Sequence, residues 1–464
     1  MLIARADAGD GRGELALRTA GERIVAIAPA LRPLAGETVF DAAGAAVLPG
    51  LHDHHLHLLA LAAALASVPC GPPQHGDAGT LAAALRAAAP ADGWIRGVGY
   101  HASVAGDIDR DWLDAVGAAA PVRVQHRSGQ LWVFDSCALA RLGLRDGPGD
   151  DPFERRDGRL TGRLYGGDDW LRARLGGALP DLQAASLALA RRGVTGVTDA
   201  SPGNGRREFE HLAAQQASGR LRQRVLVMGG EALAGVAARP GLQVGPTKLY
   251  LREAALPTFD DLCAAIARSR AAGRAVAVHC VTPSELVFAV EALRASGLHP
   301  GDRIEHASLC PDALLALLRE TGLRVVTQPN FVFERGDAYL AELPAAEIGE
   351  LYRARGFVDA GIALAAGTDA PHGEPDPWRA MAAAVRRRSR AGVALAPAEA
   401  LAPAQALALF MGDPLRPGDG APPLAVGAAA DLCVIDRSRR TLAADFAAVE
   451  VRLTLRAGEP IWPA

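Results

Sequence analysis

The stretch Pro49-Gly50-Leu51-His52-Asp53-His54-His55-Leu56-His57 completes an apolar segment, residues 45–53, that we interpret as a β-strand. Residues two apart on a strand project to the same face, so His55 and His57 can offer two imidazoles to one metal ion. A polar loop, or a chance cluster of histidines, would look the same in this stretch alone. The metal interpretation therefore depends on what the rest of the chain supplies.

Seven further β-branched runs follow this strand, and helix-like apolar patterns fill most of the gaps between them. Alternating strands and helices predict a parallel sheet of βα units, and eight such units predict an α/β fold with a (β/α)8 TIM-type barrel. We expect helices at Thr258–Ala272, Ser284–Ser296 and Pro311–Thr321. We expect the other strands at Gly193–Asp199, Arg224–Met228, Thr247–Leu251, Ala275–Cys280, Arg303–His306, Leu323–Gln328 and Ile362–Asp369.

Two parts of the chain do not fit the eightfold pattern. An insertion at about residues 72–177 carries its own strand-like runs, Trp94–Tyr100 and Val122–Arg127, and we expect it to cover the barrel mouth. Residues 1–45 and 420–464 have the pattern of short strands, and neither piece could bury a core alone. We therefore expect these two ends to pair into one small β-sandwich domain, with the barrel spanning residues 46–419.

Chemically active side chains stand at the ends of the predicted strands. His279 ends the fifth strand, His306 the sixth and Asp369 the eighth. In a barrel enzyme the carboxyl ends of all strands meet at one face, where active sites lie. A lone histidine at a strand end is usually an ordinary core or surface residue, but this whole set is harder to dismiss. Imidazole and carboxylate are ligands that zinc and similar divalent ions prefer.

Lysine is almost absent from the chain. Lysine and arginine total 49, and the only lysine is Lys248, at the end of the fourth predicted strand. A free ammonium would repel a metal, but a buried amine of lowered pKa can react with CO₂ to form a carbamate, an anion that can bridge two metals. Arginine stays protonated and cannot do this. We therefore favour Lys248 as a bridging ligand over a lysine placed there by chance.

With these residues in view, the chain resembles the amidohydrolase superfamily over nearly its whole length. The resemblance rests on the pair His55 and His57 after Pro49-Gly50, on the strand-end residues described above, and on Gly427…Asp431-Leu432…Asp436. Within the superfamily it is most similar to the amidohydrolase-3 branch, which includes N-substituted formamide deformylase and the YtcJ-like hydrolases. The supporting segments include Ile304-Glu305-His306-Ala307 and Gly367-Thr368-Asp369.

The resemblance implies a role for each ligand. His55, His57 and Asp369 would hold one metal, and His279 and His306 the other, with carboxylated Lys248 between them. Two zinc ions per chain are expected, with manganese or iron as alternatives. Asp369 would also act as the catalytic base, taking a proton from the attacking water and passing it to the leaving nitrogen.

The sequence departs from that branch near the expected pocket. Gln130 stands where relatives tend to carry histidine, Asn330 follows Gln328-Pro329 in place of histidine, and Leu249 to Glu253 replace an acidic and glycine-rich stretch. The substrates of the branch are therefore not carried over. Our candidate substrate contacts, for which ordinary packing is the alternative role, are His126, Gln130, Arg163, Asn330 and His372.

The leading functional hypothesis is metal-dependent hydrolysis of a C–N bond in an amide, an N-substituted formamide, or a cyclic imide or lactam. A deaminase, or a lactone, ester or phosphoester hydrolase, could use the same metal site, although deaminases of the superfamily usually lack a bridging lysine. A non-catalytic relative that binds a ligand is the third alternative, but such proteins typically lose metal ligands. Here none is missing.

Composition limits the partners. The net charge is −3, and the longest apolar run, Leu56 to Val68, is too short to span a membrane, so we expect a small-molecule substrate and neither nucleic acid nor membrane. The basic run from Arg386 to Arg390 is interpreted as a solvated helix terminus. Six cysteines without a C-x-x-C pair and a charged amino terminus favour a cytoplasmic protein. A homodimer stays open, since no interface signature is visible.

Overall fold

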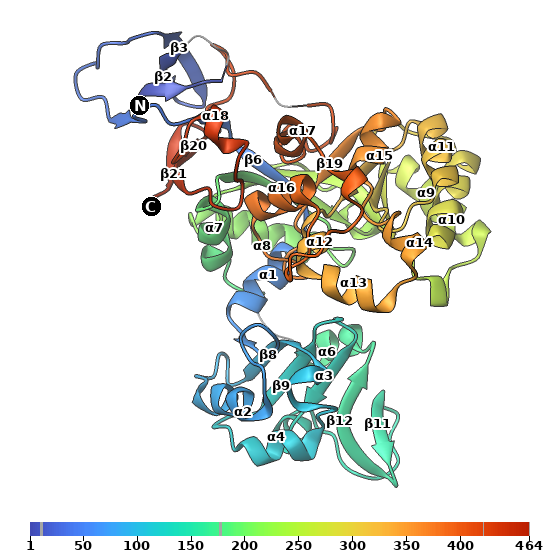
Figure 1. Cartoon of the computed structure of the whole chain (residues 1–464). Coiled ribbons are helices and arrows are strands. Elements are labelled where there is room, and N and C mark those ends of the chain that lie inside the picture. The colour runs from blue at the N-terminus through green and yellow to red at the C-terminus, as the bar shows by residue number, and fades with distance from the viewer. Residues whose placement is uncertain (10–12, 176–178, 421, 464) are drawn as a thin grey trace. The chain divides into compact units, whose positions relative to one another are not determined.

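The computed structural model describes the chain except for residues 10–12, 176–178, 421 and 464. It consists of two compact units, one formed by Met1–Leu58 with Leu182–Ala464 and the other by Leu59–Asp181 (Figure 1). The predicted end of the insertion at residue 177 lies outside the described residues, as do residues 421 and 464 of the predicted terminal domain.

An eight-stranded parallel sheet forms the centre of the first unit, and it confirms the predicted barrel. Each strand pairs with the next one along the chain. The seam between the last and first strands is joined just beyond their ends, where Asp369 N donates to His55 O and His57 N donates to Ala370 O, both at 2.8 Å. The strands are β6 (Leu51–Leu56), β13 (Val194–Asp199), β14 (Arg224–Gly229), β15 (Leu242–Tyr250), β16 (Val276–Cys280), β17 (Arg303–His306), β18 (Arg324–Thr327) and β19 (Leu364–Ala366).

The first predicted strand, residues 45–53, is divided in two in the structure. Its first part, β5 (Val47–Pro49), pairs with β20 (Leu432–Ile435) outside the barrel, and β6 begins only at Leu51. Gly50 lies between the two parts, where an added Cβ would come within 2.3 Å of Thr195 Oγ1. Glycine is therefore needed at this close approach, and the chain changes sheets there.

The three predicted helices are present, each starting or ending within about a residue of its prediction. The start of α10 has a capping box: Glu285 N donates to Thr282 Oγ1, and Thr282 N donates to the Glu285 carboxylate. The helices of this unit, beside the short turns, are α7 (Gln183–Ala190), α8 (Arg206–Ala217), α9 (Phe259–Ala271), α10 (Pro283–Ala295), α11 (Asp312–Thr321), α12 (Asn330–Glu334), α13 (Gly336–Glu342), α14 (Ala345–Ile348), α15 (Ala354–Asp359), α16 (Pro377–Arg386), α17 (Pro403–Ala408) and α18 (Arg439–Leu442).

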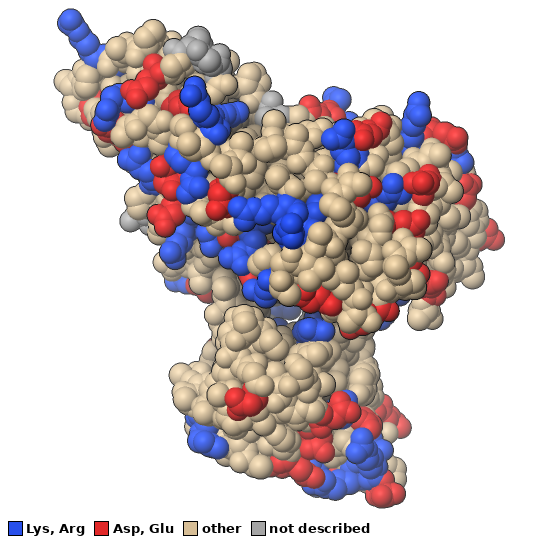
Figure 2. Space-filling model, viewed as in Figure 1, with Lys and Arg blue, Asp and Glu red and all other residues tan. Residues whose placement is uncertain are grey.

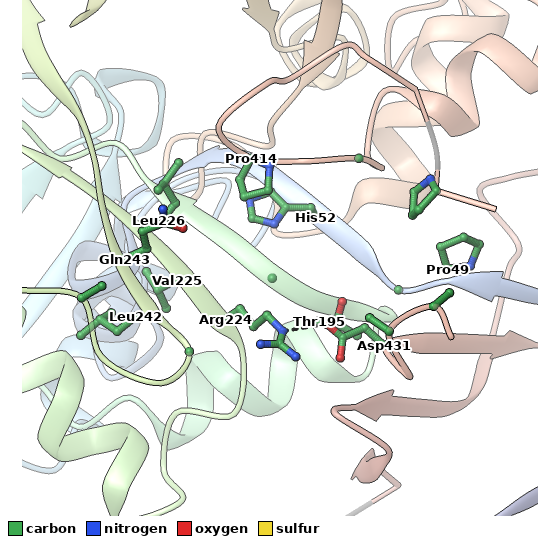
Figure 3. A pocket seen from close by; sticks show the side chains of 18 of the residues that line it. Pro49, His52, Thr195, Arg224, Val225, Leu226, Leu242, Gln243, Pro414 and Asp431 are labelled. Carbon is green, nitrogen blue, oxygen red and sulfur yellow. Dashed lines mark hydrogen bonds and ion pairs between the residues drawn. The ribbon is translucent and has the colours of Figure 1, made fainter. Parts of the chain in front are cut away.

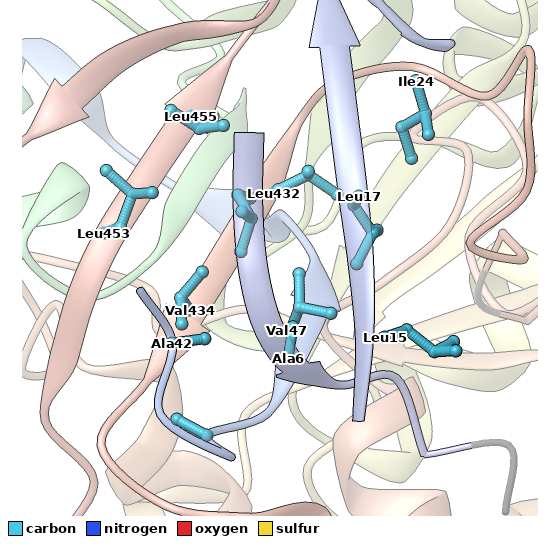
Figure 4. Packing of buried hydrophobic residues seen from close by; sticks show 12 residues of the cluster. Ala6, Leu15, Leu17, Ile24, Ala42, Val47, Leu432, Val434, Leu453 and Leu455 are labelled. Carbon is cyan, nitrogen blue, oxygen red and sulfur yellow. The ribbon is translucent and has the colours of Figure 1, made fainter. Parts of the chain in front are cut away.

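Both ends of the chain contribute to two small sheets, of order β3-β2-β1-β4 and β22-β21-β20-β5. Their buried side chains form one apolar cluster, in which Leu17 and Ile24 belong with Leu432 and Leu455 (Figure 4). Burial in a shared core explains why strands too short to be stable alone persist here. The remaining strands are β1 (Leu2–Asp7), β2 (Glu14–Ala20), β3 (Arg23–Ala28), β4 (Val39–Asp41), β21 (Val451–Arg456) and β22 (Glu459–Trp462).

The second unit has its own mixed sheet of order β11-β12-β10-β9-β8-β7, and helices with separate apolar clusters. The two strand-like runs predicted in the insertion correspond to β8 and β9. That this unit covers the barrel mouth stays a prediction. Its elements are α1 (Leu58–Leu65), which leads into it, β7 (Val68–Pro69), α2 (Ala78–Ala87), β8 (Ile95–Tyr100), α3 (Ala102–Ala105), α4 (Arg110–Val116), β9 (Val122–His126), β10 (Leu131–Phe134), α5 (Ser136–Arg141), β11 (Phe153–Arg156), β12 (Arg159–Tyr165) and α6 (Asp168–Leu175).

Acidic and basic side chains are interspersed over the visible face of the first unit (Figure 2). The sequence suggested that the basic run at the end of α16 is solvated, but this is not true of all its residues. Arg387 is buried, and its guanidinium donates to the carbonyls of Leu351, Tyr352 and Leu395. Arg387 therefore joins three segments of backbone instead of facing solvent. Within the described ranges, no helix has the length and apolar character needed to cross a bilayer.

Candidate metal centre

The six predicted ligands stand at or just after the carboxyl ends of barrel strands. His55 and His57 lie at the end of β6, Lys248 lies near the end of β15, and Asp369 follows β19; His279 and His306 are in the last two residues of β16 and β17. The barrel topology therefore places all six at the same end of the sheet, where barrel enzymes have their active sites.

Several of these side chains converge closely. One ligand atom from each of His55, His306 and Asp369 lies within 4.8 Å of the other two. Asp369 Oδ1 is 3.4 Å from His55 Nε2 and 3.2 Å from His57 Nε2. The ring of His279 is centred 4.4 Å from that of His306. The imidazoles and the carboxylate thus surround one small volume.

In three of the histidines, the Nδ1 atom lies within hydrogen-bonding distance of a side-chain oxygen. When the Nδ1 proton is donated in this way, the Nε2 lone pair is left available to a metal, as is usual for metal-ligating histidines. The partners are Glu305 Oε2 for His55, Ser201 Oγ at 3.0 Å for His57 and Gln328 Oε1 at 2.6 Å for His306.

The inner atoms of the cluster lack partners. Among the described residues, His55 Nε2, Lys248 Nζ and Asp369 Oδ1 are buried without a hydrogen bond. Buried polar atoms without partners are costly, by about 1–3 kcal/mol each. A divalent cation would satisfy the imidazole nitrogen and the carboxylate oxygen, so the donor set fits a metal ion.

Lys248 is 5% exposed, and burial lowers the pKa of its amine to about 8. An amine of lowered pKa is unprotonated in a substantial fraction of molecules near neutral pH, and only that form reacts with CO₂. The carbamate would turn a cation into an anion beside the other ligands. Lys248 therefore has the chemical setting that a bridging carbamate needs.

The backbone at two of the predicted ligands is unusual. His306 and Asp369 have φ angles of 71° and 56°, in the left-handed region that residues other than glycine rarely occupy. Asp53 supports the second of these turns, because its carboxylate accepts from Thr368 N at 3.0 Å and from Thr368 Oγ1 at 2.6 Å. At Gly367 an added Cβ would lie 2.4 Å from His55 N. Strain of this kind is typical of functional sites.

Sequence reasoning missed the residues that hold the predicted ligands in place, above all Glu305 and Arg303. Both are almost completely buried. Glu305 accepts from His55 Nδ1 through one oxygen and from Arg303 Nε through the other, and Arg303 also donates to His54 O at 3.0 Å. Burial alone would raise the pKa of Glu305, but the Arg303 guanidinium holds it well below its usual range. The available signal was a charged pair, two residues apart, within a buried strand.

We expect Glu305→Gln to weaken metal binding roughly 10- to 100-fold, because the neutral amide orients His55 less strongly than the carboxylate does. Competition with a metal indicator dye measures this. The variant also leaves Arg303 without a charged partner and should lower the unfolding temperature. Glu399→Gln is the matched control, since Glu399 is a buried carboxylate paired with Arg353 at 2.9 Å. If both variants bind metal alike, Glu305 has no orienting role.

The five candidate substrate contacts fall into two groups. His126, Gln130 and Arg163 line one cavity of about 210 Å³ within the second unit. Asn330 and His372 belong to the first unit, where the ring of His372 is centred 5.5 Å from that of His57. The second pair therefore adjoins the ligand cluster.

Asn330 lies in α12, which is tied to the loop after Asp369. Asn330 Nδ2 donates to Thr368 O at 3.0 Å and to Glu334 Oε1 at 3.2 Å. Glu334 in turn accepts from Glu374 N at 3.1 Å. Asn330 Oδ1 is buried without a partner among the described residues. The amide therefore has a structural role, and its role as a substrate contact stays a prediction.

Burial raises the pKa of Glu334 from 4.5 to about 7. The folded state thus holds this proton more tightly than the unfolded state, so the stabilisation is complete below pH 4.5 and is lost as the pH rises through about 7. We expect Glu334→Gln to gain stability relative to wild type over that range, by up to ~3 kcal/mol. Thermal unfolding of both proteins from pH 4 to pH 8 tests this. A constant difference in unfolding temperature would contradict it.

A larger cavity, of about 370 Å³, lies elsewhere in the first unit (Figure 3). Its lining residues Thr195, Arg224 and Leu242 stand at the amino ends of their strands, opposite to the ligand cluster. Arg224 pairs with Asp431 at 2.8 Å across its wall. Because barrel chemistry occurs at the carboxyl ends of the strands, we assign the candidate site to the ligand cluster despite the size of this cavity.

Comparison with known proteins places the chain among hydrolases. The profile described as "Amidohydrolase family" matches residues 38–462. N-substituted formamide deformylase of Arthrobacter pascens is 24% identical over 471 residues, which cover 86% of this chain and 85% of that protein.

Two solved structures illustrate the likeness of fold. An uncharacterized metal-dependent hydrolase from Pyrococcus horikoshii aligns with a TM-score of 0.75 at 21% identity, covering 94% of this chain and 96% of that one. Atrazine chlorohydrolase TrzN from Arthrobacter aurescens, in complex with zinc, aligns with a TM-score of 0.56 at 15% identity, covering 99% and 94%.

Proposed function

Because this chain belongs to the amidohydrolase family, we propose that it hydrolyses a C–N bond in a small-molecule amide, N-substituted formamide, or cyclic imide or lactam. The observation that carries this proposal is the convergence of Asp369 with His55, His57 and His306 at the carboxyl end of the barrel. That arrangement combines a metal-binding donor set with a carboxylate placed to move a proton.

The residues divide between holding the metal and handling the proton. His55, His57 and Asp369 would hold one metal ion, with His279 and His306 holding a second and carboxylated Lys248 joining them. We propose two zinc ions per chain, with manganese or iron as alternatives. A divalent metal, when bound, lowers the pKa of a water molecule and polarises the substrate carbonyl.

Asp369 provides the proton path. Burial alone would raise its pKa, but the adjacent imidazoles of His55 and His57 hold the pKa well below its usual range, so the group is a carboxylate at neutral pH. Its oxygen accepts the proton of the attacking water and then donates it to the departing nitrogen, which leaves as a neutral amine. The strained backbone at Asp369 and the support from Asp53 fix the direction of the carboxylate.

The test uses protein purified without chelator and assayed against a panel of amides, N-substituted formamides, cyclic imides and lactones. We expect turnover of at least one C–N substrate, its loss after dialysis against a chelator and its return with added zinc. Metal-loaded protein with no turnover of any amide or imide would refute the proposal. Turnover of lactones alone would favour the esterase alternative.

A further inference from the structure

We propose that Arg335 binds an acidic group of the substrate, so that the compound hydrolysed at the metal centre carries a carboxylate. This inference rests on the proposed function and names the class of substrate within it. Arg335 stands between α12 and α13, in the same unit as the ligand cluster.

The first observation is the position of the guanidinium. Arg335 Nη2 donates to His372 O at 2.9 Å. His372 follows the catalytic base closely, since its backbone N donates to Asp369 O at 2.8 Å, and its ring is centred 5.5 Å from that of His57. The cation therefore contacts the loop that carries both Asp369 and a candidate substrate contact.

The second observation is that the charge lacks a partner. Arg335 is half-buried, yet among the described residues no carboxylate lies within 4.0 Å of it, and its guanidinium makes one hydrogen bond although it has five N–H groups. Arg353 contrasts with it, because Arg353 pairs with both Asp312 and Glu399. None of the Arg335 nitrogens is among the buried atoms without a partner, so its unused N–H groups reach solvent, where an anion can bind them.

The third observation is that aromatic side chains lie around the Arg335 guanidinium. The guanidinium lies 3.9 Å from the centre of the Phe331 ring. The hydroxyls of Tyr339 and Tyr352 are 3.2 Å apart, and the Tyr352 ring is centred 5.9 Å from that of Phe331. Burial lowers the pKa of Arg335, but the phenols of Tyr339 and Tyr352 and the carboxyl groups of Asp369 and Glu334 outweigh burial and raise it.

Together these groups suit a carboxylate. The planar fork of arginine matches the two oxygens of a carboxylate, and the ring of Phe331 holds the fork in one orientation. Tyr339 is only partly buried, so its hydroxyl can add a third hydrogen bond. The alternative is that Arg335 merely clamps the loop through His372 O. That role would not distinguish acidic from neutral substrates.

The experiment compares N-formylphenylalanine with N-formylphenethylamine, which differ only in the carboxylate. We expect the wild type to prefer the acid. Arg335→Met, which retains packing over Phe331, should lower kcat/KM for the acid roughly 10- to 100-fold more than kcat/KM for the neutral compound, mainly through KM. Equal losses on both compounds, or a wild type without preference for the acid, would overturn the inference.

The matched control is Arg390→Met. Arg390 also lies over a phenylalanine of α12, 4.9 Å from the Phe333 ring centre, but it is paired with Glu374 at 3.4 Å. The Arg390→Met variant should leave the preference for the acidic formamide intact. If neither formamide is hydrolysed, calorimetric titration with 3-phenylpropionate still decides about Arg335: weaker binding by Arg335→Met than by wild type supports the inference, and equal binding overturns it. The proposed function is judged separately by the wider panel.

Discussion

Lys248→Arg is expected to reduce bound metal from about two ions per chain to one or fewer, and to lower kcat/KM roughly 1,000-fold. Arginine keeps its positive charge and cannot form a carbamate, so the variant would place a cation where the proposed site requires an anion. The buried position of Lys248 leaves that cation no route to solvent.

Elemental analysis of protein purified without chelator measures the metal, with wild type and variant in parallel. A second readout follows from the sequence: Lys248 is the only lysine, so a carbamate signal after labelling with ¹³C-bicarbonate can arise only there or at the Met1 amine. Comparison with the Lys248→Arg variant shows which of these two amines carries the carbamate. About one metal in both proteins would mean that Lys248 is not a ligand and would bring the deaminase and lactonase alternatives forward.

Asp369→Asn is expected to lower kcat roughly 100- to 10,000-fold with little change in KM, because an amide cannot accept the proton of the attacking water. The asparagine oxygen can still face His55 and His57, so much of the local geometry should survive. Steady-state kinetics on the best substrate of the panel measure the effect.

Metal content separates the two roles of Asp369. If Asp369 is the base, metal content should fall much less than kcat. A loss of metal in proportion to the loss of activity would mean that the residue acts only as a ligand. Asp359→Asn is the control, because Asp359 is an exposed carboxylate whose partner is Arg355 at 2.7 Å. It should leave both quantities unchanged.

Local patterns were enough to predict the barrel and where its strands end. The apolar pattern of a strand or helix lies within its own segment and does not depend on which distant segment packs against it. Runs such as Arg303–His306 and Ala275–Cys280 could therefore be located from a few residues each. The carboxyl ends of parallel strands share one face, so the residues there could be grouped without coordinates. The single lysine at such an end was also visible in the sequence.

Strand alternation could not predict how the side chains of the predicted ligands are oriented. It places Glu305 and His306 on opposite faces, yet both reach His55, because the left-handed backbone at His306 turns its side chain. The change of sheet at Gly50 was hidden for a similar reason, since the pairing of β5 with β20 and the close approach of Thr195 both involve residues distant in the sequence. Neither feature leaves a periodic trace in the sequence.

The sequence by itself thus determined the barrel, its catalytic end and the ligand candidates, since these follow from local burial and strand direction. Only the tertiary structure decided which groups meet there. Glu305 lies 250 residues from His55, and Arg335 approaches the loop after Asp369 from the junction of α12 and α13. Contacts of this kind form when the barrel closes and brings distant strand ends together, and no short segment of chain encodes that closure.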